Sequence, residues 1–479
     1  MTLRPLSLSA DLRIVDDLDR EVLLRGVNIT SLGEYWQGLA DTPPTLPLEE
    51  DDWAALADCG FSVIRLIVHW SLLEPRRGFF DTAYLDAIDG YVRSAARHGM
   101  YTLIDMHQDA YSAYIFTPEG EVCPPGYKPA KGWDGAPAWA CLTEGKSTCI
   151  RTERNDSEAV QTAWNNFYHN TEGLRDEFIQ AWAFVAQRFA GRSEVAGYDL
   201  LNEPEMSQPL ETFEPLYQRL VGETLLALRK AESVAAFGHL LFLEPALATA
   251  HPEWGYCVPD PARWGYPGDN LVAAPHNYFD SIQQGGLSLE QGSDLFVQVS
   301  MGLKIGLWVG EYGWWDAEAA SVDAARRFAA DQDAKAQGGA WWQWCQSCGD
   351  PHSVPDDPAF RRGAVSVQGH LQVLECPGNV PLGPNTPLLA ILSRPYPRAV
   401  PGRVVTLESD FQTGRFSLRA TGATPGTELL LWTGSSAATH HASGTGLTDI
   451  LRPGPAGGYL LRATVTSSDF QVSLSPDQE

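Results

Sequence analysis

The chain has 479 residues, a hydrophobic content of 44% and a formal net charge of −26. That length allows one large barrel with an appended domain, or two to three domains. The acidic excess, without any run of basic residues, argues against nucleic acid and anionic membrane surfaces as partners, because phosphate binding needs clustered Lys and Arg. No stretch approaches the roughly 18 apolar residues of a membrane span, so we expect no transmembrane segment.

A hairpin opens the chain, with strands at residues 12–15 and 22–28 around an Asp-rich turn. Short apolar runs then recur along the chain and, with residues 24–28, make eight. Runs of this length are typical of strands buried on both faces of a parallel sheet. The other seven are residues 62–68, 101–106, 195–201, 240–243, 271–274, 307–309 and 339–344.

Segments with a 3.6-residue apolar period separate these runs, at residues 48–59, 84–98, 174–189, 213–232 and 317–337. Gly60, Gly99 and Gly191 stand where helix C-caps belong. The alternation predicts an α/β fold, a (β/α)8 TIM barrel over residues 1–380. Reactive residues of such a barrel lie at the carboxyl ends of its strands.

The segment 108–171 is too long for an ordinary strand-to-helix loop and is rich in Tyr and Trp, so we expect it to form a lid or a wall of the cleft. It holds three of the eight cysteines, which indicates local disulfides in an oxidising compartment. Cys345 and Cys348 have redox or zinc spacing without a second pair, which favours a disulfide-linked loop. We therefore expect a secreted protein, although the N-terminus lacks a signal-peptide pattern.

From residue 381 the sequence pattern changes to short predicted strands between Ser-, Gly- and Pro-rich turns. We expect strands at residues 388–393, 403–407, 415–420, 428–433 and 458–465. This spacing predicts an antiparallel β-sandwich over residues 381–479.

Two glutamates follow predicted barrel strands, in Asn202-Glu203-Pro204 and in Gly310-Glu311-Tyr312. Two strand-end carboxyl groups are what hydrolysis of a glycosidic bond requires, so we assign both glutamates as catalytic. Apolar neighbours predict a raised pKa for Glu203, which suits a general acid, whereas Glu311 must stay ionised with an ordinary or lowered pKa to attack. The plainer alternatives are a helix cap for Glu203 and a structural salt bridge for Glu311.

Arg65 is a lone cation in an apolar run, so it needs a carboxylate partner, and we expect it to keep Glu311 ionised. Asn202 is placed to bind a sugar 2-hydroxyl, and Tyr278 to donate to Glu311. We expect further substrate contacts from polar and aromatic residues at other strand ends: His107, Asp109, His276, Trp342 and Trp344. Alternation puts the two tryptophans on one face, and one of them should floor the sugar site. His69 and Trp70, after the second strand, are further candidates.

The histidines do not form a HExxH pattern and are not joined by a carboxylate at metal-ligand spacing. Nucleotide-binding glycine patterns are absent from the sequence as well. We therefore expect neither a catalytic metal nor a cofactor.

The set Arg65, His107, Asn202-Glu203, His276-x-Tyr278, Glu311 and the strand-eight Trp resembles glycoside hydrolase family 5 in identity and order, over residues 12–350. The resemblance implies a retaining double displacement with Glu203 as acid/base and Glu311 as nucleophile. Residues 23–36, 105–112 and 198–204, with the trailing sandwich, resemble the endoglycoceramidase branch, which cleaves the β-bond between an oligosaccharide and ceramide. The first-strand loop carries no lysine of the kind that grips the glycan in some branch members, so galactosylceramide-type specificity stays open.

Two rival functions remain. The same catalysis on another β-glycoside would make the chain an endo-glucanase, mannanase or β-glucosidase. A non-catalytic carbohydrate-binding protein is the alternative of another class, although binding alone needs no second glutamate. A glycosphingolipid substrate also needs an apolar groove, for which we suggest Ile115-Phe116 and Trp314-Trp315, and it brings peripheral contact with a lipid or micelle surface.

Overall fold

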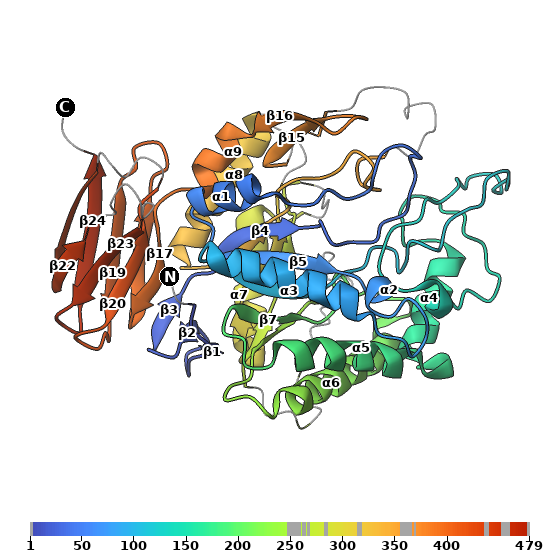
Figure 1. Ribbon diagram of the computed structural model, residues 1–479, viewed down its shortest axis with the longest axis horizontal. Helices are drawn as coiled ribbons and strands as arrows, with labels where there is room; N and C mark the ends of the chain where they lie inside the picture. Colours follow the sequence, from blue (N-terminus) through green and yellow to red (C-terminus); the bar gives the residue numbers. More distant parts are fainter. Residues whose placement is uncertain are drawn as a thin grey trace.

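A computed structural model represents the chain. It describes residues 3–246, 260, 265, 269–281, 286–313, 319–354, 366–367, 370–434, 440–451 and 460–476. Figure 1 shows a barrel with its helices and, beside it, a stack of antiparallel strands near the C-terminus.

Parallel strands form the central sheet, and all eight predicted runs contribute to it. Its first five strands follow one another in chain order: β4 (Arg25–Ile29), β5 (Val63–Val68), β6 (Tyr101–Met106), β7 (Val195–Asp199) and β8 (Leu240–Leu243). The remaining strands are β9 (Leu271–Ala273), β10 (His276–Asn277), β11 (Gly306–Leu307), β12 (Val309–Tyr312) and β13 (Gly339–Trp341). The predicted TIM barrel is confirmed.

The barrel closes through its sixth and seventh strands, each of which is broken into two segments. β9 pairs with β11 and β10 pairs with β12, while β8 and β13 connect these segments to the rest of the sheet. β13 pairs in turn with β4, which completes the circle. In the β10–β12 pair His276 lies opposite Glu311, so the break brings these two residues side by side.

Helices cover the outside of the barrel (Figure 1). The five predicted ones are α1 (Glu50–Asp58), α3 (Thr82–Arg97), α5 (Leu174–Phe189), α6 (Leu210–Glu232) and α8 (Ala319–Ala334). The sequence reading missed α2 (Trp70–Leu73), α4 (Glu158–Tyr168), α7 (Leu289–Leu303), α9 (Thr386–Leu392) and the 3-10 turns η1 (Ala138–Ala140) and η2 (Thr171–Gly173).

Helix α3 shows why the periodic segments fold as predicted. Asp81 caps its first turn by accepting hydrogen bonds from the backbone N–H groups of Ala83 and Tyr84. Leu85, Ile88, Val92 and Ala95 recur on one side and are buried. Gly99 follows with a φ of 74°, the left-handed conformation that ends helices.

The N-terminal strands belong to the C-terminal sheet rather than to the barrel. In the seven-stranded sheet β3 (Arg20–Val22) pairs with β17 (Tyr396–Pro401), next to β1 (Leu6–Leu8) and β2 (Ile14–Asp16). Leu6 and Ile14 share a buried cluster with barrel-interior residues such as Leu24 and Leu103, so these strands cover the end of the barrel at which its strands begin. The division into domains at residue 380 stays a prediction. The pairing of β3 with β17 joins residues from both sides of that boundary.

Two antiparallel sheets form the predicted sandwich. β20 (Glu428–Trp432), β23 (Leu460–Val465) and β22 (Leu447–Leu451) complete the first sheet. The second holds β18 (Arg403–Ser409), β19 (Phe416–Thr421), β24 (Phe470–Pro476) and β21 (His440–Thr445). Alternate residues of facing strands, such as Phe416, Leu418, Leu429 and Leu431, fill a common core.

One predicted strand is wrong. Residues 388–393 lie largely in helix α9, which begins at Thr386-Pro387, and Leu388, Ile391 and Leu392 pack on the barrel core. The short apolar run fits either element, and proline in the first turn favours the helix. A small sheet of β14 (Ser366–Val367), β15 (Gln372–Glu375) and β16 (Val380–Pro384) precedes it.

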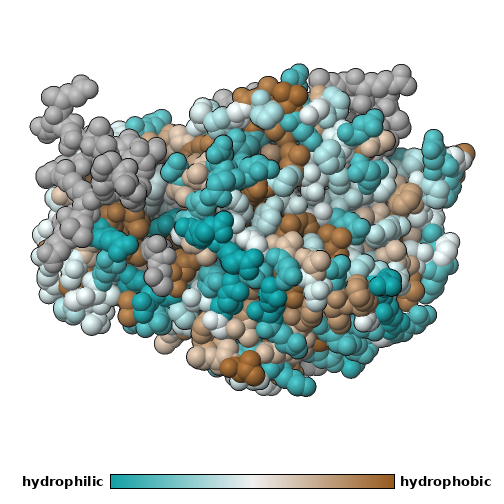
Figure 2. Space-filling view, in the orientation of Figure 1, coloured by the Kyte–Doolittle hydropathy of each residue, from teal (hydrophilic) through white to brown (hydrophobic). Residues whose placement is uncertain are grey.

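Hydrophilic and hydrophobic residues alternate over the face drawn in Figure 2. Among the described helices, none combines the length and apolar character that crossing a membrane requires.

The barrel and the sandwich meet at Gly60, directly after α1. Its carbonyl oxygen accepts hydrogen bonds from the Tyr396 hydroxyl (2.7 Å) and from Arg398 Nη2 (3.0 Å). Its φ is 81°, and a Cβ atom there would lie 2.2 Å from the buried Trp432 ring. Gly60 therefore lets the two parts of the chain pack closely.

Gly60→Ala should lower the free energy of unfolding by about 2–4 kcal/mol, because backbone strain adds to overpacking against Trp432. Gly78→Ala is the matched control, since Gly78 has a φ of 75° but nothing within 4 Å of its Cβ position. It should cost only about 1 kcal/mol. Chemical denaturation measures both variants, and equal losses would contradict the packing argument.

Candidate active site

Arg65 lies at the centre of the candidate site, in the middle of β5 and with no exposed surface. Its Nη1 donates to Glu311 Oε1 at 2.8 Å and its Nε donates to Asp199 Oδ2 at 2.9 Å. Its Nη2 lies 2.7 Å from Glu244 Oε1 and 3.0 Å from Asp105 Oδ1. The expected pairing with Glu311 is present, and three further carboxylates share the same cation.

Glu311 stands on β12 and is 4% exposed. The Tyr278 hydroxyl donates to its Oε2 at 2.9 Å, as expected, so one oxygen faces Arg65 and the other faces Tyr278. Burial raises the pKa of Glu311 to about 7, although the charges of His276 and Arg65 act in the opposite direction. The expected ordinary or lowered pKa is therefore wrong, because Arg65 is shared among several acids.

Glu203 follows β7 and has a φ of 38°, a strained conformation for a residue with a Cβ. His276 Nδ1 lies 2.8 Å from its Oε1, and Arg154 Nη2 donates to its Oε2 at 2.9 Å. Burial acts to raise the pKa of Glu203, but the His276 hydrogen bond and the charges of His276 and Arg154 outweigh it and lower the pKa to about 2. The expected raised pKa is wrong for this arrangement.

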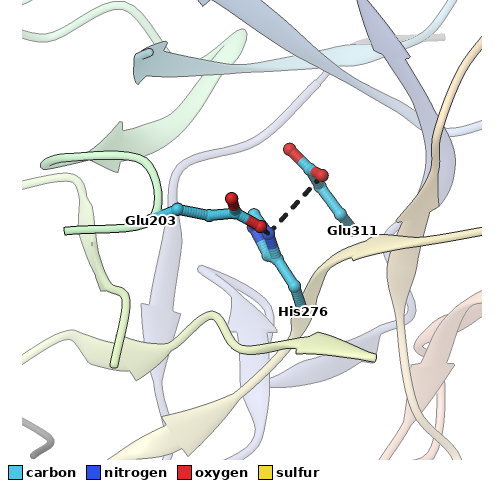
Figure 3. A group of neighbouring side chains, drawn as sticks. All are labelled: Glu203, His276 and Glu311. Carbon is cyan, nitrogen blue, oxygen red and sulfur yellow. Dashed lines mark hydrogen bonds and ion pairs between the residues drawn. The ribbon is translucent and has the colours of Figure 1, made fainter. Parts of the chain in front are cut away.

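The two candidate catalytic carboxyl groups face each other across His276 (Figure 3). His276 Nδ1 is 3.4 Å from Glu311 Oε2 as well as close to Glu203. One carboxylate oxygen of each glutamate and a ring nitrogen of His276 all lie within 4.8 Å of one another. This separation suits a retaining glycosidase, whose carboxyl groups stand about 5–5.5 Å apart, and is shorter than the roughly 6.5–9.5 Å of an inverting one.

Carboxyl groups outnumber cations here, and their pKa values reflect it. Burial raises the pKa of Asp105 to about 7, of Asp199 to about 6 and of Glu244 to about 8, against the charge of Arg65 or His276. Nearby carboxylates also raise the pKa of His276 well above its ordinary value, against the effect of its burial. The site therefore holds protons at neutral pH, and its members titrate as a coupled set.

Of the two further candidates after the second strand, Trp70 is buried in helix α2, where its indole N–H donates to Glu74 Oε2 at 2.9 Å. The other predicted substrate contacts meet at the same rim, with one exception. Asn202 accepts from Arg65 Nη2 (3.0 Å) and donates to the Gln108 carbonyl (3.0 Å). His107 Nδ1 lies 2.7 Å from Asp105, and its ring stacks on Trp342 at 5.5 Å. Trp342 Nε1 is buried without a hydrogen-bond partner among the described residues, as expected of a ring beside a substrate.

Trp344 is the exception. Its indole N–H donates to Asp52 of α1 (3.1 Å), and its ring packs in the outer barrel core, away from Trp342, which packs with Ile67 and Tyr278. The expected alternation is wrong because β13 ends at Trp341, so Trp342 and Trp344 do not belong to the paired strand. The predicted pair Trp314-Trp315 lies outside the described residues.

The long segment forms a wall of the site, as predicted. Arg154 reaches Glu203 from it and also pairs with Asp109 Oδ1 at 2.5 Å. The guanidinium lies 4.8 Å from the Trp133 ring, and His352 Nε2 contacts the other oxygen of Asp109 at 3.0 Å. The disulfide Cys123–Cys149 ties the segment together.

Cys348 and Cys376 form the second described disulfide, whereas Cys345 is free, so Cys345 and Cys348 are not bonded to each other. A disulfide does close the loop after strand eight, with a partner that the sequence left open. Free Cys59 and Cys141 are both partly buried.

Sequence reasoning missed Glu244, Asp199, His352 and Arg154. Glu244 directly follows β8, so the strand-end rule that found Glu203 would have found it too. Asp199 was visible as an acid inside a predicted buried strand opposite a buried arginine. Arg154 and His352 lie in irregular segments, and no local pattern marks them.

Within the described part of the chain, two groups of side chains bring possible metal ligands within 4.8 Å of one another: Glu203, His276 and Glu311, and Asp105, Asp199 and Glu244. Arg65 already donates to the second group, and Arg154 and Tyr278 donate to the first. These carboxylates are thus arranged as hydrogen-bonded ion pairs, and the absence of a catalytic metal stays a prediction.

The raised pKa of Glu311 gives a stability prediction. A carboxyl group whose folded-state pKa exceeds its unfolded value stabilises the protein below the unfolded pKa and loses that contribution as pH rises through the folded one. Between about pH 5 and pH 8, Glu311→Gln should therefore gain up to about 3 kcal/mol of unfolding free energy relative to wild type.

Asp89→Asn is the control, because the pKa of Asp89 is lowered: burial opposes this shift, but Arg188, Arg192 and Arg93 outweigh it, and none of these groups titrates in this range. Its stability difference from wild type should stay constant over the same range. Denaturation curves at each pH measure both variants, and a flat Glu311→Gln difference would refute the raised pKa.

Residues 19–347 match the cellulase family, glycosyl hydrolase family 5. An endoglycoceramidase of Cyanea nozakii is 30% identical over 217 residues, which cover 40% of either protein. Endoglycoceramidase I of Rhodococcus hoagii is 31% identical over 198 residues, covering 40% of this chain and 35% of that protein. The chain thus aligns with only about two fifths of the length of these relatives.

The similarity to solved structures extends over the whole chain. A crystal structure of an endogalactoceramidase is 34% identical, with a TM-score of 0.88, and the match covers 99% of this chain and 100% of that one. An endo-glycoceramidase II from Rhodococcus is 23% identical with a TM-score of 0.72, covering 98% and 99%, and shares the fold. With the family match over most of its barrel, the chain belongs to glycosyl hydrolase family 5.

Proposed function

We propose that this protein is a retaining endo-β-glycosidase that hydrolyses the bond between the glycan and ceramide of glycosphingolipids. The observation that carries the catalytic part is the approach of the Glu203 and Glu311 oxygens to within 4.8 Å at the carboxyl end of the barrel. A non-catalytic binding protein has no use for such a strained, closely spaced carboxyl pair.

The reaction proceeds in two displacements. Glu311 attacks the anomeric carbon while Glu203 gives its proton to the departing ceramide oxygen, which leaves a covalent glycosyl ester on Glu311. Glu203 then takes a proton from water, and the resulting hydroxide oxygen displaces Glu311 from the sugar. Arg65 and Tyr278 fix one oxygen each of the nucleophile, so the attacking group is oriented before substrate arrives.

The first step needs the proton on Glu203, whereas the contacts described above favour it on Glu311. Substrate binding must therefore weaken the ion pair between Glu203 and Arg154. Arg154 Nη2 contacts both Glu203 and Asp109, so a sugar that takes the place of Arg154 beside Asp109 also draws it away from Glu203. Displacing it leaves Glu203 free to hold the proton.

The glycolipid specificity rests on similarity. The endogalactoceramidase structure matches nearly the whole chain at 34% identity, which favours a galactosyl-ceramide linkage. Incubation with ganglioside, lactosylceramide, galactosylceramide and cellulose, followed by mass identification of the products, tests this. Released ceramide supports the proposal, and cleavage of cellulose alone refutes its lipid part.

Contact with a lipid surface and secretion are part of the same proposal. Tyr114, Phe116 and Val122 of the long segment are 44%, 38% and 89% exposed, which gives this wall an apolar outer edge. The two described disulfides fit an oxidising compartment outside the cytoplasm. Binding to neutral lipid vesicles and expression with a secretion signal test the two points.

Glu311→Gln should reduce hydrolysis by about 10⁴-fold or more, because the covalent intermediate cannot form while the rest of the pocket stays in place. Glycolipid binding should persist. Ceramide release and binding to glycolipid micelles are the measurements, and near-wild-type turnover would show that Glu311 is not the nucleophile.

Glu203→Ala should keep activity on an aryl glycoside with a good leaving group, and azide should accelerate it by forming a β-glycosyl azide. The nucleophile still forms the intermediate, and azide attacks it without a general base. Wild-type enzyme should release the β-anomer first from a β-linked substrate. NMR identifies both products, and an initial α-anomer would overturn the retaining mechanism.

A further inference from the structure

Glu244 is a buried carboxyl group that touches Glu203 and also Arg65 and His276, the two residues that lie between it and Glu311. It follows the last residue of β8 and is 2% exposed. The two-displacement reaction described above gives it no chemical step. Its contacts nevertheless connect the acid/base, the histidine between the two glutamates and the central arginine.

The two oxygens of Glu244 have separate partners. Oε2 accepts a hydrogen bond from the backbone N–H of Glu203 at 2.8 Å. Oε1 accepts from Arg65 Nη2 at 2.7 Å and lies 3.2 Å from His276 Nε2. Three groups therefore point at one carboxylate, and a carboxylate is the side chain that accepts from several donors at once.

The backbone contact holds Glu203 at a conformation that it would otherwise avoid. Its φ of 38° is strained, and such residues persist only where the surrounding structure over-determines them. The Glu203 carbonyl accepts from Gln108 Nε2 at 2.9 Å, so the peptide groups on either side of the residue are both anchored. Glu244 supplies the anchor on the amide side of Glu203.

The histidine contact orients a second group. His276 Nδ1 lies 2.8 Å from Glu203 Oε1, and its other nitrogen faces Glu244. A carboxyl group beside one ring nitrogen fixes the orientation of the ring, and so the direction in which the N–H of the other nitrogen points. Glu244 thus determines how His276 meets the acid/base.

We propose that Glu244 is a positioning residue that holds Glu203 in its acid/base geometry, through the Glu203 backbone amide and through His276. This inference rests on the proposed glycosidase function and adds a residue to its machinery. The loss of Glu244 harms the steps that need Glu203 as acid or base more than the attack by Glu311.

The test uses Glu244→Gln and Glu244→Asp. Glutamine offers one oxygen and places an amide donor against a donor, so it cannot serve both Arg65 and Glu203. Aspartate keeps the charge but is one methylene too short to reach all three partners. Either variant should lose about 10- to 100-fold in kcat/KM on a substrate with a poor leaving group, the loss expected for a hydrogen bond to a charged group.

The same variants should lose much less in the glycosylation step on a dinitrophenyl β-glycoside of the same sugar, because that leaving group departs without acid assistance. On this substrate removal of the glycosyl group needs the base, so azide should accelerate turnover and give a β-glycosyl azide. A merely structural weakening lowers the rate on both substrates alike and shows no azide response.

Glu232→Gln is the matched control. Glu232 is a buried carboxylate whose Oε1 lies 2.5 Å from Nδ1 of His239, at the opposite end of the same strand β8. It should leave the ratio of the two substrates and the azide response as in wild type. Circular dichroism and thermal unfolding confirm folding of each variant, and Glu244→Asp carries the test if Glu244→Gln does not fold.

Glu203→Ala, run in parallel, separates this inference from the proposed function. Azide acceleration of Glu203→Ala without acceleration of either Glu244 variant refutes the positioning role alone. A Glu203→Ala variant that azide does not accelerate refutes the acid/base assignment beneath it. Equal losses on both substrates in the Glu244 variants also overturn the positioning role.

Discussion

A guanidinium group without exposed surface has to be neutralised inside the protein. Arg65 imposes that requirement on the residues at the carboxyl end of the barrel. Its partners come from the rim residues of β6, β7, β8 and β12, so five strands of the sheet must deliver their ends to one point. Removing Arg65 itself would leave several buried carboxylates without their cation, which is strongly destabilising. Below this layer the barrel interior is apolar. The ion pairs of the polar layer need particular residues at particular positions, so this layer fixes the register of the strands. In the apolar layer, residues of similar volume can replace one another.

Arg65 does not neutralise all of its partners, because more carboxyl groups surround it than one positive charge can balance. The surplus charge is removed by protonation, and His276, Glu244 and Glu311 share those protons. A group that must attack as an anion is thus held where ionising it costs stability. Active sites commonly accept such a cost, since the same strain makes the group reactive. Arg154 adds a second control from outside the barrel, by pairing with Glu203 until a substrate competes for it.

Much of the fold could be predicted because parallel barrel strands are buried on both faces and read as uninterrupted apolar runs. The strand-end rule then located Glu203, Glu311, His276 and Tyr278 from those runs alone. The errors have local causes. Residues 388–393 form a run too short to distinguish a helix from a strand. Strand β17 escaped notice because it contains Pro397 and Pro401, and its register shifts between Pro397 and Ala399, as proline in a strand requires. Its pairing with β3 joins residues that are far apart in the chain, such as Val22 and Ala399, and no local pattern encodes that contact.

The pKa values show where sequence reasoning ends. Apolar neighbours along the chain suggested a protonated Glu203, and burial does act in that direction. The groups that reverse it are Arg154, from an irregular segment, and His276, from a distant strand. Electrostatics depends on partners within a few ångströms in space, whereas a motif records only neighbours in sequence. Identity and position of a catalytic residue can therefore be read from a strand end, but its protonation state belongs to the assembled site and changes when a ligand displaces one of its partners.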